Sequence, residues 1–348
     1  MPRVLSRLPA RLAAAAVIAV VAVGFAIASS VSAARQNASL TIYSGRDERL
    51  VKPIMDRFSQ ETGIELKVRY ASSVSLANAL IEEGSRSPAD VFWATEPGTL
   101  GLVAARGLLA RLPATIVGKV PSRFSTPSRR WVGTSARSRA LVYNTQALAP
   151  SELPSSVWEL TRPRWKGKLG IAPTNGSFQA FLRATIYLHG EDRVRDWLRG
   201  LKANEVKLFP NNTSIVQAVG RGDILLGLVN HYYLYNVLAE TPGLPIRNAW
   251  FRPGDPGNLV LAAGVGIVAA TRQPALAQRF VQFLLSRWAQ RYIARGPGLA
   301  EYPLVKGVNP RSGLPPLKEI AGPKYNLGRL AADLPLAVKL LLEEGFLA

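Results

Sequence analysis

Residues 40–62 read LTIYSGRDERLVKPIMDRFSQET, and this stretch combines a short strand, a turn and a helix. The run Leu40–Tyr43 is rich in residues that favour strands, and Ser44-Gly45 is typical of a turn. From Leu50 to Thr62 the apolar residues recur at helical spacing. A strand followed at once by a helix is the repeating unit of α/β proteins, so this stretch predicts that class.

The same unit returns along the chain. Residues 64–70 alternate as a strand, residues 75–83 have helical spacing, and residues 90–93 form a further strand. Repeated units of this kind predict a largely parallel sheet. Later strand–helix pairs are expected at residues 168–171 with 178–189, 206–209 with 214–219, and 224–229 with 233–240.

The length of the chain favours two domains. Its 348 residues exceed the roughly 250 to 300 residues at which a single core stops growing. Because no long flexible linker separates the halves, we expect two lobes joined by short extended crossings near residues 138–143 and 260–267. Ligands of open α/β sheets collect beyond the carboxyl ends of strands, so the residues that follow each strand are the candidate site.

The N-terminus has the pattern of a secretory signal. Three arginines within the first eleven residues precede the apolar run Leu12–Ala28, and small residues follow up to Ala33. This order predicts a signal peptide over residues 1–33 and a mature protein in the periplasm or elsewhere outside the cytoplasm. An uncleaved N-terminal anchor is the alternative.

The chain is strongly basic and lacks the motifs of common enzymes. Its 43 Lys and Arg against 23 Asp and Glu give a net charge of +20, but they are scattered without a nucleic-acid motif. We expect no nucleic-acid partner and interpret the charge as a bias towards anionic ligands. There is no Walker A loop, G-x-S-x-G or H-E-x-x-H motif, and no cysteine. A binding protein is therefore expected rather than an enzyme; a secreted hydrolase or transferase is the rival from another class.

Two adjacent tyrosines, Tyr232 and Tyr233, follow an apolar strand in LGLVNHYYLYN. A phenol titrates at about pH 10, but a bound cation can hold it as a phenolate at neutral pH. Phenolate oxygen is a hard anionic donor that suits Fe³⁺. The alternative is that both rings are half-buried filler with their hydroxyls hydrogen-bonded. The neighbouring His231 is interpreted as a structural residue.

Polar residues at helix starts indicate an anion site. Asn175-Gly176-Ser177 and Asn212 stand where a strand gives way to a helix, and free backbone amides there attract anions. Arg46 and Arg137 could hold the same anion by paired hydrogen bonds. Ordinary helix capping and surface exposure are the alternatives.

Acidic side chains after the early strands are candidate metal ligands. Asp47 and Glu96 are the best placed of these. Solvated surface carboxylates are the alternative for both, because charged residues mostly stay exposed.

With these features together, the sequence resembles the periplasmic ferric-ion-binding proteins of bacterial iron ABC transporters. The resemblance covers essentially the whole mature chain. It implies a type II periplasmic-binding-protein fold, in which two α/β lobes joined by hinge strands close over Fe³⁺ and a synergistic anion and then serve a membrane permease. The segments that carry it are LTIYSGRDERL, ETGIEL, SPADVFW, RWKGKLG, APTNGSFQAF, NNTSIVQAVGRGD, LGLVNHYYLYN, DPGNLV and EYPLV.

The resemblance also implies roles for residues. The shared iron ligands of the family fall on Tyr232 and Tyr233, Asp47 replaces a family histidine, and Glu96 stands one residue beyond a family glutamate. The resemblance implies a small anion such as phosphate, carbonate or citrate, and the sequence does not choose among them. The anion-holding positions fall on Asn175, Gly176, Ser177, Asn212 and Asn230.

The implied organisation is a monomer with two interleaved lobes. Lobe one is expected at residues 38–137 and 260–310, and lobe two at residues 138–259 and 311–348. On the same fold, the rival is a receptor for an organic anion such as a phosphonate or sugar phosphate. The missing histidine and the high positive charge leave that rival open.

Overall fold

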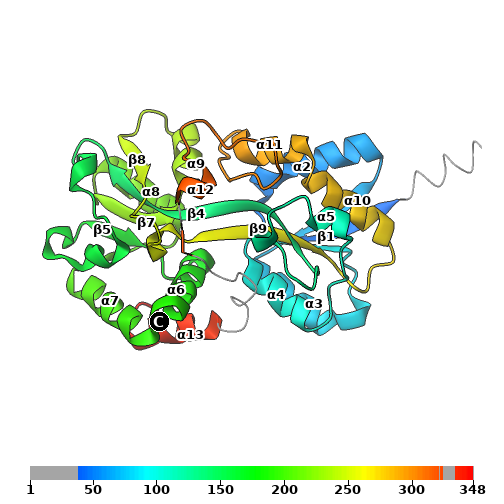
Figure 1. Cartoon of the computed structure of the whole chain (residues 1–348), viewed down its shortest axis with the longest axis horizontal. Coiled ribbons are helices and arrows are strands. Elements are labelled where there is room, and N and C mark those ends of the chain that lie inside the picture. The colour runs from blue at the N-terminus through cyan, green and yellow to red at the C-terminus, as the bar shows by residue number, and fades with distance from the viewer. Residues whose placement is uncertain (1–37, 321, 324–333, 348) are drawn as a thin grey trace, which may run out of the picture.

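The computed structural model describes residues 38–320, 322–323 and 334–347. The expected signal peptide, residues 1–33, lies outside the described residues. The described chain forms two α/β lobes with a pair of strands running between them (Figure 1). The α/β class and the two-lobed shape predicted from the sequence are therefore confirmed.

The lobe that contains the N-terminal strands is built from the predicted strand–helix units. Strand β1 pairs in parallel with β2 and β3. Helix α2 buries Val51, Ile54 and Phe58 on one face, and Gly63 ends it in the left-handed conformation at φ 70°. The elements here are β1 (Ser39–Ser44), α2 (Glu48–Thr62), β2 (Glu65–Tyr70), α3 (Ser73–Glu83), β3 (Val91–Ala94), α4 (Pro97–Ala105), α5 (Ala114–Val117), α10 (Pro274–Leu284) and α11 (Arg287–Arg295).

The other lobe repeats the same construction. Strand β5 pairs in parallel with β6 and β7, and α8 and α9 follow β6 and β7 along the chain. Helix α13, near the C-terminus, packs against α6. The elements are β5 (Leu169–Ile171), α6 (Gly176–His189), α7 (Glu191–Ala203), β6 (Lys207–Leu208), α8 (Asn212–Arg221), β7 (Leu226–Asn230), α9 (Tyr233–Glu240), β8 (Ile246–Ala249), α12 (Leu317–Ile320) and α13 (Leu334–Glu343).

Two antiparallel strands connect the lobes. Strand β4 (Val132–Asn144) pairs with β9 (Val260–Ile267) along its first half and with β7 and β8 along its second half. The sheet order β2-β1-β3-β9-β4-β7-β5-β6 is therefore continuous across the molecule. Both predicted crossings lie in β4 and β9, and their antiparallel pairing makes the sheet mixed.

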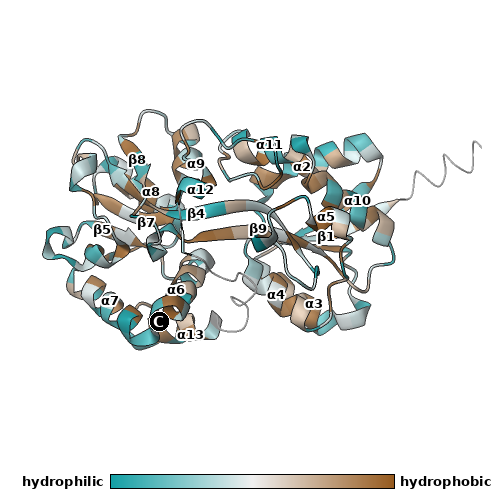
Figure 2. Ribbon diagram, in the orientation of Figure 1, coloured by the Kyte–Doolittle hydropathy of each residue, from teal (hydrophilic) through white to brown (hydrophobic). Residues whose placement is uncertain are grey.

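The apolar residues concentrate where the elements pack. Figure 2 shows brown strands inside the lobes, while α2, α7 and α11 carry teal residues. Every residue of β4 is buried, as expected for a strand covered on both faces. Within the described residues, no helix is both long and apolar enough to cross a membrane.

Candidate functional site

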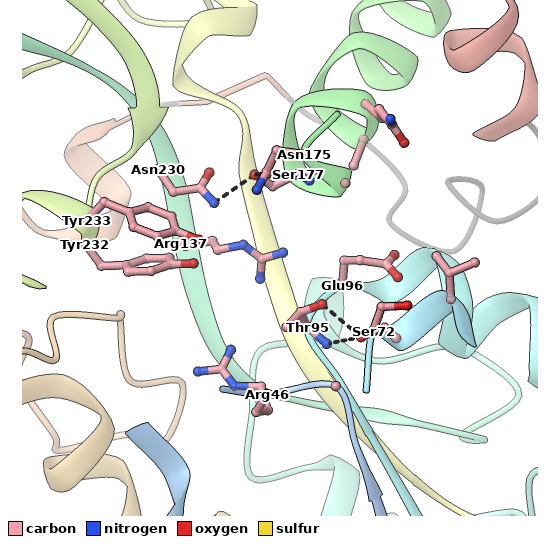
Figure 3. Close-up of a pocket in the computed structure, with 16 residues that line it drawn as sticks. Arg46, Ser72, Thr95, Glu96, Arg137, Asn175, Ser177, Asn230, Tyr232 and Tyr233 are labelled. Atoms are coloured by element: carbon pink, nitrogen blue, oxygen red, sulfur yellow. Dashed lines mark hydrogen bonds between the residues drawn. The ribbon is translucent and has the colours of Figure 1, made fainter. Parts of the chain in front are cut away.

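A cavity of about 280 Å³ lies between the lobes, next to the carboxyl ends of β1, β3, β5 and β7 (Figure 3). A second cavity, of about 490 Å³, adjoins it and shares Arg46, Thr95 and the tyrosine pair. Most of the candidate residues meet here, as the strand-end rule predicts. Those lining the first cavity are Arg46, Glu96, Arg137, Asn175, Gly176, Ser177, Asn230, Tyr232 and Tyr233; Asp47 lines the second.

Tyr232 and Tyr233 lie side by side at the start of α9. Their rings stack with centroids 4.4 Å apart and planes 28° apart. Figure 3 shows both hydroxyls pointing the same way, towards Arg137. The neighbouring Tyr232 phenol and burial raise the pKa of Tyr233 well above its usual value. Without a bound cation, Tyr233 is therefore held as a neutral phenol.

Three arginines lie near the tyrosines, and the side chains of all three are buried: Arg46, Arg137 and Arg139. Arg137 is 3 % exposed, its Nη1 has no hydrogen-bond partner, and Figure 3 shows its guanidinium in the cavity. Arg139 donates to the carbonyl of Leu228 at 2.6 Å. Burial lowers the pKa of Arg139 to about 9, so it keeps its charge at neutral pH. A buried guanidinium that lines a cavity and has an unpartnered N–H is a ready partner for an anion.

The first turn of α6 forms the polar wall opposite the arginines. Asn175 caps this helix by accepting from the backbone N–H of Ser177 at 3.0 Å, and Asn230 donates from Nδ2 to Ser177 Oγ at 3.1 Å. A side chain at Gly176 would meet no atom within 4 Å. The space beside this helix start is open, which an anion at the helix N-terminus requires.

The two candidate acids both cap helices. Glu96 accepts from the backbone N–H of Gly98 at 2.6 Å at the start of α4. Asp47 accepts from the backbone N–H of Arg49 at the start of α2, and its carboxylate also pairs with the Arg49 side chain at 3.1 Å. This side-chain hydrogen bond from Arg49 lowers the pKa of Asp47. The structure thus gives each acid a capping role, and their metal ligation stays a prediction.

Asn212 does not reach the cavities. It is 1 % exposed and is absent from the lining of both, and the cap of α8 is made by Asn211, which accepts from the backbone N–H of Ser214 at 2.9 Å. The start of α8 was predicted well, but the side chain of Asn212, its first residue, is buried inside the lobe. The anion role expected for Asn212 has no geometric support here.

Glu301 is the site residue that the sequence did not reveal. It lines the larger cavity, pairs with Arg46 and accepts a hydrogen bond from Ser135. Burial acts to raise the pKa of Glu301, but the charge of Arg46 and these hydrogen bonds outweigh it and the pKa is lowered. Only its place in EYPLV marked this residue, because no local pattern shows which distant partner a glutamate meets.

His231 adjoins the tyrosines but turns into the protein. Its Nδ1 accepts from the backbone N–H of Ser138 at 3.2 Å, and its Nε2 lies 2.7 Å from the carbonyl of Ala300, to which it donates. The described ranges hold no group of three or more His, Cys, Asp or Glu that could bind a metal ion.

Comparison with known proteins gives consistent matches. The model of the family described as bacterial extracellular solute-binding protein matches residues 40–296. An Fe(3+)-binding periplasmic protein of Serratia marcescens is 32% identical over 332 residues, which are 95% of this chain and 97% of that protein.

Two solved structures share the fold over almost their whole length. Iron-bound HitA from Pseudomonas aeruginosa has a TM-score of 0.83 and 35% identity, covering 88% of this chain and 99% of that chain. A Trichodesmium IdiA (FutA) structure in complex with iron and citrate has a TM-score of 0.74 and 26% identity, with the same coverage of 88% and 99%. The type II periplasmic-binding fold expected from the sequence is thereby confirmed.

Proposed function

This chain belongs to the bacterial extracellular solute-binding proteins, and from that premise we propose that it captures Fe³⁺ with a small anion and delivers the ion to the permease of an ABC importer. The Serratia relative is named for Fe(3+) binding, and the Pseudomonas structure holds iron. Both match nearly the whole described chain, which favours ferric iron over an organic anion as the ligand. These relatives are solute-binding proteins, which supports binding rather than catalysis.

The stacked pair Tyr232 and Tyr233 carries the proposal. Two phenol oxygens that point the same way can both bind one hard cation, which displaces their protons. Asp47 and Glu96 are the carboxylates that would approach this ion from the other lobe. Each carboxylate already caps the start of a helix, so we expect its contribution to ferric affinity to be smaller than that of the tyrosines.

The anion is assigned to the space between Arg137 and the first turn of α6. Arg137 offers an unpartnered N–H, and Arg46, Asn175, Ser177 and Asn230 line the same cavity. Such an anion would add its own oxygen ligands to those of the tyrosines and would offset the charge of the arginines. Phosphate, carbonate and citrate all carry the required oxygen donors; the Trichodesmium relative holds citrate.

Capture and delivery would be linked by closure of the lobes. Residues 38–137 with 260–310 would move as one lobe and residues 138–259 with 311–348 as the other, with bending in β4 and β9. Because the tyrosines stand on one lobe and Asp47 and Glu96 on the other, the bound ion selects the closed form. A monomer in the periplasm, exported by the N-terminal signal, would present this form to the permease.

A titration with ferric nitrilotriacetate tests the proposal. The metal-stripped mature protein should develop a visible band from phenolate-to-iron charge transfer. Tyr232→Phe and Tyr233→Phe should each abolish tight ferric binding and leave the thermal unfolding curve nearly unchanged. No band in a folded protein, or unchanged ferric affinity in either variant, would reject the tyrosine site and revive an organic anion as the ligand.

A further inference from the structure

A buried ion pair joins Arg46, which follows β1, to Glu301, which follows α11. The two residues are 255 positions apart, and they are 7 % and 1 % exposed. The second carboxylate oxygen of Glu301 accepts from Ser135 Oγ of β4. Both oxygens are thus occupied, and the carboxylate has a fixed position beside the cleft.

The backbone on either side of Glu301 is anchored to the strand that crosses between the lobes. Tyr302 and Ala136 of β4 exchange two backbone hydrogen bonds, at 2.9 and 2.7 Å. On the other side, the carbonyl of Ala300 accepts from His231, the residue before Tyr232. Glu301 is therefore tied to β4 and to the segment that carries the tyrosines.

The charge of this carboxylate acts on the proposed metal ligands. Arg46 and Glu301 line the same cavity as Tyr232 and Tyr233, so the carboxylate lies close enough for its charge to influence an ion bound there. Arg46 and Arg137 are buried and line the two cavities, and Glu301 is a buried carboxylate in the lining of the larger one. Without Glu301, the cleft would favour anions still more strongly over a metal cation.

We propose that Glu301 is a specificity-determining residue, whose fixed negative charge offsets Arg46 so that the cleft accepts a metal cation as well as an anion. Arg46 then offers hydrogen bonds to the anion without adding net charge to the metal site. This inference rests on the proposed ferric function, because it concerns how Glu301 sets the relative affinities for Fe³⁺ and for the anion.

The charge of Glu301 should affect the affinity for the anion and the affinity for Fe³⁺ in opposite directions. A phosphate dianion lowers the charge of the cleft by two, whereas Fe³⁺ that displaces two phenol protons raises it by one. Removing one negative charge must therefore strengthen the anion step and weaken the metal step. A merely structural role for Glu301 would weaken both steps together.

The test is Glu301→Gln, which keeps the size of the side chain and removes its charge. Calorimetry with inorganic phosphate on the metal-free protein should show binding about tenfold tighter than in the wild type. Competition with nitrilotriacetate at saturating phosphate should show ferric affinity about fivefold weaker. The matched control is Glu48→Gln, because Glu48 lines the same cavity but is exposed; solvent screening should keep both changes below about twofold.

A double variant guards against misfolding, because the single change leaves Arg46 buried without its partner. Arg46→Gln combined with Glu301→Gln leaves no unpaired charge in this pair. Relative to Arg46→Gln alone, the double variant should bind phosphate more tightly and Fe³⁺ more weakly. Thermal unfolding identifies which variants are folded.

The outcomes separate this inference from the ferric function. If the wild type shows no ferric band, the proposed function fails, while the phosphate comparison still tests the charge effect. If the wild type binds Fe³⁺ but folded Glu301→Gln shifts both constants in the same direction, or neither, Glu301 has no role in selecting the ligand.

Discussion

Asn230 donates a hydrogen bond from Nδ2 to Ser177 Oγ across 3.1 Å, and this contact ties the end of β7 to the first turn of α6. The same side chain accepts from Arg139 Nη1 at 3.4 Å. Asn230 thus stands between a cation and the helix start assigned to the anion, immediately before His231 and the tyrosine pair.

We expect Asn230→Asp to weaken anion binding with little loss of stability. The new carboxylate would repel a phosphate at this turn, so affinity measured by calorimetry on the metal-free protein should fall about tenfold or more. Arg139 can pair with the carboxylate, so the fold should persist. Asn211→Asp is the control, because Asp caps α8 as well as Asn does and Asn211 lies outside both cavities. Equal phosphate affinity in the two variants would show that the anion does not bind beside the first turn of α6.

Ferric binding should weaken as the pH falls. Tyr233 is protonated without metal because its pKa is raised, so uptake of iron must release phenol protons. Lower pH opposes that release, and two phenols predict a slope of about two in the logarithm of ferric affinity per pH unit. Loss of the charge-transfer band on acidification measures the slope. A pH-independent affinity, after correction for nitrilotriacetate protonation, would show that the phenols are not ligands.

The sequence predicted the parts of this site that depend on local pattern. Tyr232 and Tyr233 come within three residues of the end of a strand, and strand ends meet along one edge of a sheet. The helix start at Asn175 was found for the same reason, since a cap and a Gly mark it locally. That these residues meet in the cavity could therefore be predicted without any knowledge of long-range contacts.

The rest of the site depends on contacts that sequence spacing does not show. Glu301 meets Arg46 from the far end of the chain. Arg139 shares a strand with Arg137, yet nothing in the sequence shows that both face inward or that β4 is buried along its whole length. Asn212 was expected at the anion, but the chain turns one residue earlier and Asn211 takes the cap.

His231 should make the protein less stable in acid. Burial lowers its pKa from 6.5 to about 4, so the folded state keeps the ring neutral where the unfolded chain already binds a proton. The associated stability is complete above pH ~6.5 and is lost as the pH falls towards about 4, by roughly 3 kcal/mol. His231→Gln should lower the free energy of unfolding and flatten this part of its pH dependence in urea titrations. The same pH dependence in variant and wild type would contradict this origin.

Substitutions at two glycines of the cleft should have different effects, one mainly on stability and the other mainly on anion binding. A Cβ at Gly45 would lie 2.0 Å from Ser73 Oγ, so Gly45→Ala should cost about 1–3 kcal/mol of stability. Gly176 has open space beside it and a negative φ, so Gly176→Ala should leave stability nearly unchanged. Its methyl group would enter the space assigned to the anion, and phosphate affinity should fall severalfold. Equal effects of both changes on unfolding and on phosphate binding would contradict this assignment.

The helix-capping carboxylates need a test that separates capping from ligation. Replacing Asp47 by Ala should cost about 0.5–2 kcal/mol through the cap alone, whereas Asp47→Ser keeps a capping oxygen and removes the carboxylate. We expect Asp47→Ser to retain most of the stability and to lose less ferric affinity than Tyr232→Phe, because the Asp47 carboxylate is held by Arg49. Glu96→Gln should behave similarly, since an amide oxygen can still accept from Gly98. Complete loss of ferric binding in folded Asp47→Ser would instead make Asp47 a primary ligand that leaves Arg49 when the lobes close.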